Sequence, residues 1–254
     1  MEVKIMFCLK GKNAIITGGN TGLGLGITKA ILEAGANVCI LTYSDFDEIV
    51  AELKGKGHNV CGIHCDLSDK ADLENSFNKA VEMFGGKIDI LINNAGIQRR
   101  NKCEDFLYQD WLDVIEVNLN AVFTLCQLAG RKMLEAGSGK IINMASMLSF
   151  FGGQTVPAYA ASKGAVAQLT KALSNEWSSR GVNVNAIAPG YMDTEMNVAL
   201  VNDSDRNTQI LARIPMGRWG KPEDIGGVAV FLASEAAKYV TGAVIPVDGG
   251  YLSK

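Results

Sequence analysis

Short runs of Val, Ile and Leu alternate along the chain with longer stretches in which apolar residues recur at helical spacing. Short apolar runs are typical of strands buried on both faces, and the longer periodic stretches are typical of helices that cover them. The alternation predicts an α/β fold with a doubly wound, mostly parallel, seven-stranded sheet and helices on both faces. The expected strands cover residues 13–17, 38–41, 60–65, 88–93, 140–145, 182–188 and 244–247, and the clearest helices cover 28–34, 47–54, 72–84, 111–136 and 158–179.

The pattern continues without a break over residues 1–254. No internal repeat, linker or low-complexity tract divides it, so we expect one domain. The stretch 190–220 is an exception, because it follows the sixth expected strand and has no regular pattern. Ligands bind beyond the carboxyl ends of the strands in open α/β sheets. We therefore interpret residues 190–220 as a substrate-covering insertion rather than a second domain.

Composition and charge narrow the possible function classes. The 254 residues are 48% hydrophobic and 20% charged, which is typical of soluble globular proteins. The net charge of −3 argues against nucleic-acid binding, which needs a basic face. No apolar run reaches ~18 residues and the first twelve residues do not resemble a signal peptide. We expect a cytoplasmic protein with no membrane partner.

Six cysteines raise the question of a metal site. Cys61, His64 and Cys65 are close in sequence, but side chains alternate along a strand, so Cys61 and Cys65 would share one face and His64 the other. No second pair of ligands accompanies them. We therefore expect buried thiols in a reducing compartment and no metal.

A glycine-rich turn follows the first expected strand and leads into a helix. It reads Thr17-Gly18-Gly19-Asn20-Thr21-Gly22-Leu23-Gly24. Glycines there leave backbone N–H groups open to a phosphate pair at the positive end of the helix, although glycines also permit a purely structural corner. No Gly-Lys-Ser/Thr closes the loop, which excludes a P-loop. The place between strand and helix favours a dinucleotide.

The spacing Gly-x-x-x-Gly-x-Gly resembles the short-chain dehydrogenase/reductase family, and further motifs of that family recur in order along nearly the whole chain. The resemblance implies a Rossmann-type fold, a nicotinamide cofactor and hydride transfer. The recurring motifs are Asp66-Leu67 after the third strand, Asn93-Asn94-Ala95-Gly96 after the fourth, Asn118 in the long helix, Ser146 after the fifth strand, Tyr159-x-x-x-Lys163 in the next helix and Pro189-Gly190 after the sixth strand.

Tyr159 and Lys163 are four residues apart and hence neighbours on one helix face. A free tyrosine has a pKa near ~10, which an adjacent ammonium and a positive nicotinamide ring would lower. Tyr159 is therefore a candidate general acid/base, although most such pairs are only surface residues. The resemblance implies that Tyr159 exchanges a proton with the substrate and that Lys163 tunes it and holds the nicotinamide ribose.

The resemblance also assigns roles to residues that alone would be taken for a cap or a polar break in a helix. Ser146 is expected to hydrogen-bond the reacting oxygen, and Asn118 to anchor a water. Asp66 is expected at the adenine, Asn93 on the adenosine side and Thr194 at the carboxamide. The full expected cofactor set is Gly18, Asn20, Thr21, Gly22, Leu23, Gly24, Thr42, Asp66, Leu67, Asn93, Ala95, Gly96, Tyr159, Lys163, Pro189, Gly190, Met192 and Thr194.

The chain lacks the usual markers that distinguish NAD from NADP. Thr42 stands where NAD-preferring relatives carry an acidic residue. Asn20 and Thr21 are neutral, whereas NADP-preferring relatives carry a basic residue there or near the end of the second strand. Asp45 and Asp47 lie just beyond and should repel a 2′-phosphate. We therefore expect NAD and leave NADP open.

Residues 93–100, 140–150, 156–159, 185–192 and 213–220 resemble a narrower group of the family, the dehydrogenases that act at C5 of 2-dehydro-3-deoxy-D-gluconate, with those acting on gluconate as near neighbours. Arg99 and Arg100 follow the fourth strand at the cleft, and a sugar acid needs a cationic fork for its carboxylate. A solvated arginine pair is the equal alternative. The expected substrate residues are Arg99, Arg100, Ser146, Met147, Gln154, Tyr159 and Tyr191.

Two other interpretations stay open. One is a reductase of another carbonyl, such as a 3-oxoacyl chain or a sterol. The other is a cofactor-binding regulatory protein without turnover, against which the intact Ser146, Tyr159 and Lys163 argue. Relatives in the family form oligomers, so we expect a homo-oligomer, either a tetramer or a dimer. Small residues on the helix 158–179 permit close contact between helices; they are Ala160, Ala161, Ala165 and Ala167.

Overall fold

The computed structural model describes residues 6–254 of the chain. Its centre is a sheet of seven parallel strands in the order β3-β2-β1-β4-β5-β6-β7. The order reverses between β1 and β4, where doubly wound sheets bind their ligands. The predicted Rossmann-type fold is confirmed, and each expected strand lies close to its expected bounds. The strands are β1 (Asn13–Thr17), β2 (Asn37–Thr42), β3 (Val60–His64), β4 (Ile90–Asn93), β5 (Gly139–Met144), β6 (Val182–Pro189) and β7 (Val244–Val247).

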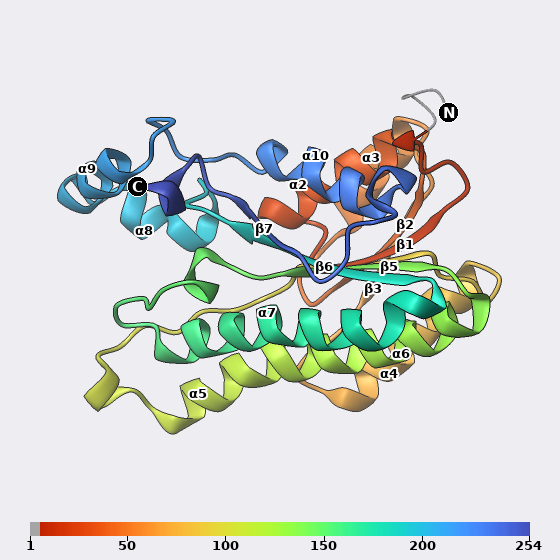
Figure 1. The fold of residues 1–254 in the computed structure, drawn as a ribbon, viewed down its shortest axis with the longest axis horizontal. Coiled ribbons are helices and arrows are strands. Elements are labelled where there is room, and N and C mark those ends of the chain that lie inside the picture. The colour runs from red at the N-terminus through yellow and green to blue at the C-terminus, as the bar shows by residue number, and fades with distance from the viewer. Residues whose placement is uncertain (1–5) are drawn as a thin grey trace.

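Helices cover both faces of the sheet (Figure 1). On one face α2, α3 and α10 pack over a buried cluster that includes Ile16, Ile27 and Ile225. On the other face α4, α6 and α7 pack over a cluster that includes Ile15 and Phe77. Successive residues of β1 thus enter opposite clusters, which is why its apolar run is continuous. The helices are α2 (Gly22–Glu33), α3 (Asp47–Gly55), α4 (Lys70–Met83), α5 (Tyr108–Ile115), α6 (Ala121–Ala136), α7 (Pro157–Trp177), α8 (Val198–Val201), α9 (Ser204–Arg213) and α10 (Glu223–Ala233).

A π-helical turn at Glu116–Asn120 joins α5 to α6, so that residues 108–136 form one continuous helix. By length and composition alone, this helix is apolar enough to cross a membrane. Its second half packs under the sheet through buried residues such as Leu125 and Cys126. Much of its apolar character therefore belongs to the core.

The structure corrects two expectations about helices. The helix expected over 28–34 begins at Gly22, because the glycine-rich turn itself supplies the first helical turn. The stretch 190–220, expected to be irregular, contains α8 and α9. The carboxylate of Asp203 begins α9 by accepting a hydrogen bond of 3.0 Å from the backbone N–H of Arg206.

The cysteines near β3 follow the alternation of a strand. Cys61 and Cys65 both pack on the cluster beneath α4 and α6. His64 is exposed and lies against Tyr43, with 5.1 Å between ring centres. Over residues 6–254, no three His, Cys, Asp or Glu side chains lie close enough together to hold a metal ion.

Candidate active site

A cavity of about 710 Å³ opens at the edge of the sheet where β1 and β4 end. The glycine-rich turn lines it, and so do Ser146, Tyr159 and Lys163. The cavity thus joins the expected cofactor site to the expected catalytic group. The cofactor residues expected from the sequence that line it are Gly18, Asn20, Thr21, Gly22, Leu23, Gly24, Thr42, Asp66, Leu67, Ala95, Gly96, Tyr159, Lys163, Pro189, Gly190, Met192 and Thr194.

The glycine-rich turn fits a phosphate pair. Gly18 and Gly22 have φ angles of +60° and +49°, a region that favours glycine. A Cβ on Gly24 would lie 1.9 Å from the carbonyl oxygen of Gly18, whereas one on Gly22 would meet nothing closer than Thr194 at 3.9 Å. The turn is therefore closely packed on its inner side and bare toward the cavity. The free N–H groups at the start of α2 are available to an anion there.

Two residues hold this turn against the end of β4. The hydroxyl oxygen of Thr17 accepts hydrogen bonds of 3.0 Å from the backbone N–H groups of both Asn94 and Ala95. The side-chain amide of Asn94 donates to the carbonyl oxygens of Thr17 and Gly18, at 3.0 and 3.1 Å. Neither side chain was singled out from the sequence. Asn94 stands within the Asn-Asn-Ala-Gly motif, which is the signal that pointed to it.

Asn93 is the one expected cofactor residue that does not line the cavity. Its side chain is 2% exposed and donates to Asn143 Oδ1 at 2.8 Å and to Cys126 Sγ at 3.3 Å. Its own Oδ1 has no hydrogen-bond partner among the residues that the structure describes. The structure therefore places this side chain in a buried polar network beneath the site, because a residue at the end of β4 points into the core when its neighbour points into the cavity.

Asn20 connects the glycine-rich turn to the end of β2. Its Nδ2 donates to Ser44 Oγ at 2.9 Å and to the carbonyl oxygen of Asp45 at 2.8 Å, and its Oδ1 accepts from Thr42 Oγ1 at 2.9 Å. The Asp45 carboxylate accepts from the backbone N–H of Asp47 at 2.9 Å. Neither aspartate lines the cavity. The structure therefore does not support the expectation that these two aspartates repel a 2′-phosphate in the cavity. Hydroxyl and amide groups border the part of the cavity next to β2.

The catalytic candidates come from three elements. Ser146 follows β5, and its Oγ accepts a hydrogen bond of 3.1 Å from the backbone N–H of Leu148. Tyr159 and Lys163 lie on α7, with Lys163 Nζ 5.6 Å from the centre of the Tyr159 ring. Lys163 Nζ donates to the carbonyl oxygen of Met144 at 2.6 Å. These contacts point both side chains of α7 toward the end of β5.

Asn118 lies in the π-helical turn and is completely buried. Its Oδ1 accepts from the backbone N–H of Ile97 at 2.8 Å, and its Nδ2 donates to the carbonyl oxygen of Ile97 at 2.9 Å. A Cβ on Gly96 would lie 3.2 Å from Asn118 Oδ1 and 3.7 Å from Lys163 Nζ. Asn118 and Lys163 therefore approach the same point of the β4 loop.

Burial controls the titration of the catalytic group. It raises the pKa of Tyr159 above its ordinary value, while a hydrogen bond with Ser146 and the positive charge of Arg100 act in the opposite direction. Burial also lowers the pKa of Lys163 to about 8. Burial is the largest of the causes that act on the pKa of Tyr159, so in the protein alone it outweighs the groups that favour the phenolate.

The expected substrate residues divide into two groups. Arg99, Ser146 and Tyr159 line the cavity. The charge of Arg99 is already offset, because its Nε lies 3.6 Å from Asp110 and its Nη2 lies 3.8 Å from Asp113. The residues that do not line the cavity are Arg100, Met147, Gln154 and Tyr191.

These four residues have other surroundings. Met147 and Tyr191 belong to an apolar cluster beside the insertion, and Gln154 is exposed. Arg100 Nη2 donates to Gln98 Oε1 at 2.9 Å. Cavity residues that sequence reasoning missed include Val117, Glu195 and Asn197, and the last two carried no signal beyond their closeness to Thr194.

Comparison with known proteins agrees with this geometry. A family profile described as enoyl-(acyl carrier protein) reductase matches residues 18–252. The 2-dehydro-3-deoxy-D-gluconate 5-dehydrogenases of Bacillus subtilis and Pseudoalteromonas atlantica are 51% and 50% identical, each over 98% of this chain and 97% and 98% of their own. The structure of a gluconate 5-dehydrogenase from Burkholderia cenocepacia, in complex with NADP and tartrate, is 38% identical, has a TM-score of 0.95 and aligns over 100% of both chains.

Proposed function

Because the chain belongs to the short-chain dehydrogenase/reductase family, we propose that it is a 2-dehydro-3-deoxy-D-gluconate 5-dehydrogenase that uses NAD. One observation carries the proposal: Ser146, Tyr159 and Lys163 line the same cavity as the glycine-rich turn at the start of α2. The chain is an oxidoreductase of the NAD(P)-dependent type, and the two similar proteins from Bacillus subtilis and Pseudoalteromonas atlantica support the choice of a C5 sugar-acid substrate.

The cavity residues fit a nicotinamide dinucleotide. The bare glycine-rich turn at the start of α2 would hold its pyrophosphate, and Thr42 with Asn20 would border the adenosine ribose. When bound, the nicotinamide supplies a hydride acceptor or donor. NAD is proposed because the cavity residues next to Thr42 in the described part of the chain, Tyr43 and Ser44, carry no positive charge, although the Burkholderia cenocepacia structure is in complex with NADP.

Tyr159 performs the proton transfer at the substrate C5 oxygen. In the oxidising direction its phenolate oxygen takes the proton of the C5 hydroxyl, and in the reducing direction its hydroxyl returns that proton. Ser146 hydrogen-bonds the same oxygen and holds it beside Tyr159. Since burial keeps the tyrosine neutral in the protein alone, a positive charge from the bound cofactor is needed to favour the phenolate.

Lys163 and Asn118 assist this proton transfer. The Lys163 ammonium, which here donates to Met144, would turn to the ribose hydroxyls of the cofactor. Asn118 fixes the loop at Ile97, and its proposed role is to anchor a water molecule that links Lys163 to solvent. Both residues act on the orientation and protonation of Tyr159.

The carboxylate of the substrate needs a cation near the cavity mouth. Arg99 and Arg100 both follow β4, but Arg99 is offset by Asp110 and Asp113. Arg100 is the better candidate, because its guanidinium has only the neutral Gln98 as a side-chain partner among the hydrogen bonds described for residues 6–254.

Turnover tests the proposal. Purified protein should reduce NAD with 2-dehydro-3-deoxy-D-gluconate, with kcat/KM higher than for NADP and higher than for D-gluconate. Tyr159→Phe removes only the hydroxyl, so it should lower the rate by at least ~10²-fold while cofactor affinity stays nearly unchanged. Retention of most activity by Tyr159→Phe would refute the mechanism. A clear preference for NADP would overturn the cofactor assignment alone.

Two alternatives have specific support. A gluconate 5-dehydrogenase is favoured by the Burkholderia cenocepacia structure, and an acyl-chain reductase by the description of the family profile. The same assay with D-gluconate and with a 3-oxoacyl substrate separates them from the proposed reaction. A regulatory protein without turnover would be indicated only by inactivity toward all three substrates.

We also propose that the enzyme is a cytoplasmic homo-oligomer, a tetramer or a dimer. Exposed apolar side chains on and next to the long helix support an interface there: Leu107 is 63% exposed, Tyr108 75% and Phe123 47%. Analytical ultracentrifugation gives the number of subunits, and a monomer at micromolar concentration would contradict the proposal.

A further inference from the structure

The helix α9 lies at the same end of the molecule as the catalytic residues. Figure 1 shows α8 and α9 beyond the carboxyl ends of the strands, across from the start of α7. α9 is held there by an apolar cluster in which Ile210 and Ile214 pack with Met147 and Tyr251. Met147 follows Ser146 directly in the chain. The face of α9 that carries Ile210 therefore lies beside the loop of the catalytic serine.

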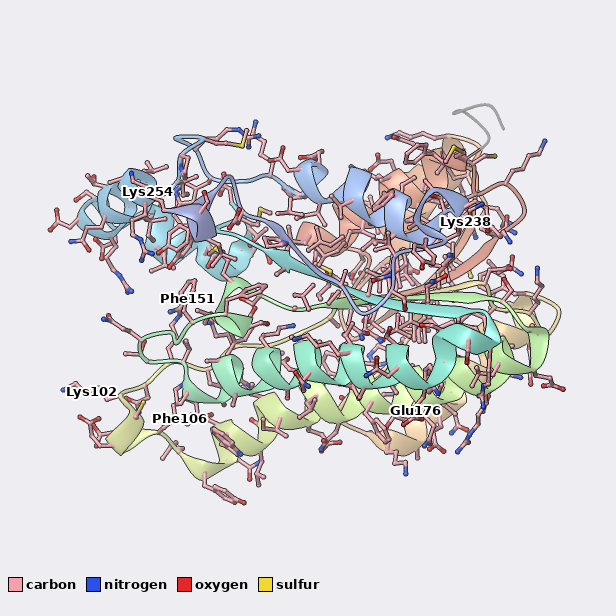
Figure 2. All side chains as sticks on the ribbon, in the orientation of Figure 1. Lys102, Phe106, Phe151, Glu176, Lys238 and Lys254 are labelled. Carbon is pink, nitrogen blue, oxygen red and sulfur yellow. The ribbon has the colours of Figure 1, made fainter. Side chains whose placement is uncertain are left out.

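Aromatic residues extend this attachment. The rings of Phe151 and Tyr251 stack with 5.9 Å between their centres, and Figure 2 labels Phe151 on the loop that leads from β5 to α7. Trp219 Nε1 donates to Asn207 Oδ1 on α9 at 2.8 Å. The insertion is thus fixed to the loop that precedes Tyr159, and its position bears on the substrate.

Arg206 lies on the inner face of α9. It precedes Ile210 by four residues, and residues four apart lie on the same side of a helix. Ile210 faces the apolar cluster, so Arg206 lies one turn farther along that same face. Its side chain is exposed and makes no ion pair within the part of the chain that the structure describes.

Arg100 is exposed in the loop that follows β4. The backbone N–H of Asn101 donates to the carbonyl oxygen of Thr155 at 3.0 Å, which attaches the loop of Arg100 to the loop that leads into α7. Thr155 has a φ of +63°, which is rare for a β-branched residue. The attachment is therefore held in a strained conformation, as is common where a loop is positioned for binding.

Arg100 is within electrostatic range of both Arg206 and the catalytic tyrosine. Burial lowers the pKa of Arg100, and the positive charge of Arg206 lowers it further, whereas Tyr191 and Tyr159 act in the opposite direction. Arg100 is therefore close enough to the insertion and to the acid/base residue for the charges of both to act on it. No carboxylate among the ion pairs of residues 6–254 offsets either arginine.

We propose that Arg206 is the second cation of the substrate-carboxylate site, so that Arg100 from the β4 loop and Arg206 from α9 bind one carboxylate between them. This inference rests on the proposed sugar-acid function. It places in the insertion 190–220 a residue that binds the carboxylate of the substrate. Without substrate the two like charges repel each other. A carboxylate placed between them replaces this repulsion by two charge-assisted hydrogen bonds and draws α9 toward the β4 loop.

Substitution of Arg206 tests the inference. Arg206→Gln removes the charge from an exposed side chain, and Arg206→Lys retains it. Arg180→Gln, an exposed arginine at the far end of α7, is the matched control for the change in net charge. Each protein is assayed with NAD and with either 2-dehydro-3-deoxy-D-gluconate or 3-deoxy-D-fructose, in which a CH₂OH group replaces the carboxylate.

We expect Arg206→Gln to raise KM for the acid by roughly 10-fold or more, the effect of losing one charge-assisted hydrogen bond, with kcat little changed. KM for the neutral sugar should stay the same, Arg206→Lys should recover part of the loss and Arg180→Gln should behave as the wild type. An unchanged KM for the acid, or an equal loss on both sugars, would overturn the inference.

Failure of the proposed function gives a different result. In that case the wild type itself would not oxidise 2-dehydro-3-deoxy-D-gluconate. Calorimetric titration of the NAD complex with D-gluconate would then still decide the role of Arg206, since the carboxylate is the same. Weaker binding to Arg206→Gln than to the wild type and to Arg180→Gln would support a second cation, and equal binding to all three would refute it.

Discussion

Replacing Thr17 by Val removes a single oxygen atom from the junction between the glycine-rich turn and the end of β4. That oxygen accepts two hydrogen bonds of 3.0 Å, from the backbone N–H groups of Asn94 and Ala95. Valine has nearly the same shape as threonine, so packing is retained while both donors lose their partner. Thr17 itself is 2% exposed, and no solvent replaces the oxygen on its side.

The magnitude follows from the two orphaned donors. A buried donor without a partner costs about 1–3 kcal/mol. Since Asn94 and Ala95 are only half-buried, we expect Thr17→Val to lower the free energy of unfolding by about 2–4 kcal/mol in total. Thr17→Ser keeps the oxygen and loses one buried methyl group, which costs about 1 kcal/mol. The turn should also shift in the valine variant and weaken NAD binding.

Urea unfolding of the wild type, Thr17→Val and Thr17→Ser under identical conditions measures the difference. Calorimetric titration with NAD measures the effect on the cofactor site. The valine variant should be the less stable of the two and the weaker binder. Equal stability of the two variants, or a serine variant less stable than the valine one, would refute the reasoning from the two N–H groups.

Two further predictions concern burial. Burial lowers the pKa of Lys163 from 10.5 to about 8, so between pH 8 and pH 10.5 the folded chain binds fewer protons than the unfolded chain. The free energy of unfolding of the wild type should therefore rise with pH across that window, and Lys163→Met should lose this rise. Urea unfolding at several pH values measures the difference. A Cβ on Gly226 would lie 2.7 Å from Ala30 Cβ, whereas one on Gly227 meets nothing within 4 Å. Gly227→Ala should therefore stabilise by about 0.5–1 kcal/mol and Gly226→Ala should destabilise by about 1 kcal/mol or more; thermal unfolding that shifts in the same direction for both would contradict this.

The sheet could be predicted because its strands carry their own signal. A parallel strand covered on both faces is apolar at nearly every position, and β1, which is buried throughout, has three consecutive apolar residues between Asn13 and Thr17. The insertion was harder to predict, since α9 buries one residue, Ile210, and its first six residues are polar. Its apolar partner Met147 is distant in sequence. Such a helix is stabilised by a tertiary contact that no local pattern reveals.

In the candidate site, too, local features could be predicted from the sequence and long-range contacts could not. Gly18, Gly22 and Gly24 could be predicted, because bare backbone at a helix N-terminus has a recognisable spacing. The contacts that hold this turn could not, because Thr17 and Asn94 are 77 residues apart. The orientation of Asn93 was missed for a simpler reason: a motif gives the order of its residues, but the end of β4 decides which of two neighbouring asparagines points into the core.

The π-helical turn at Glu116–Asn120 also changes the phase of the long helix, so that the side chains of α5 and α6 are rotated relative to one another about the helix axis. A regular α-helix rotates by about 100° for each residue, so deletion of a single residue in this turn would rotate α5 by that angle relative to α6. Val114, fully buried in α5, would then leave the core. One uninterrupted stretch of chain can thus present one side to the sheet through α6 and a different side to α7 through α5, which no straight helix of this length could do.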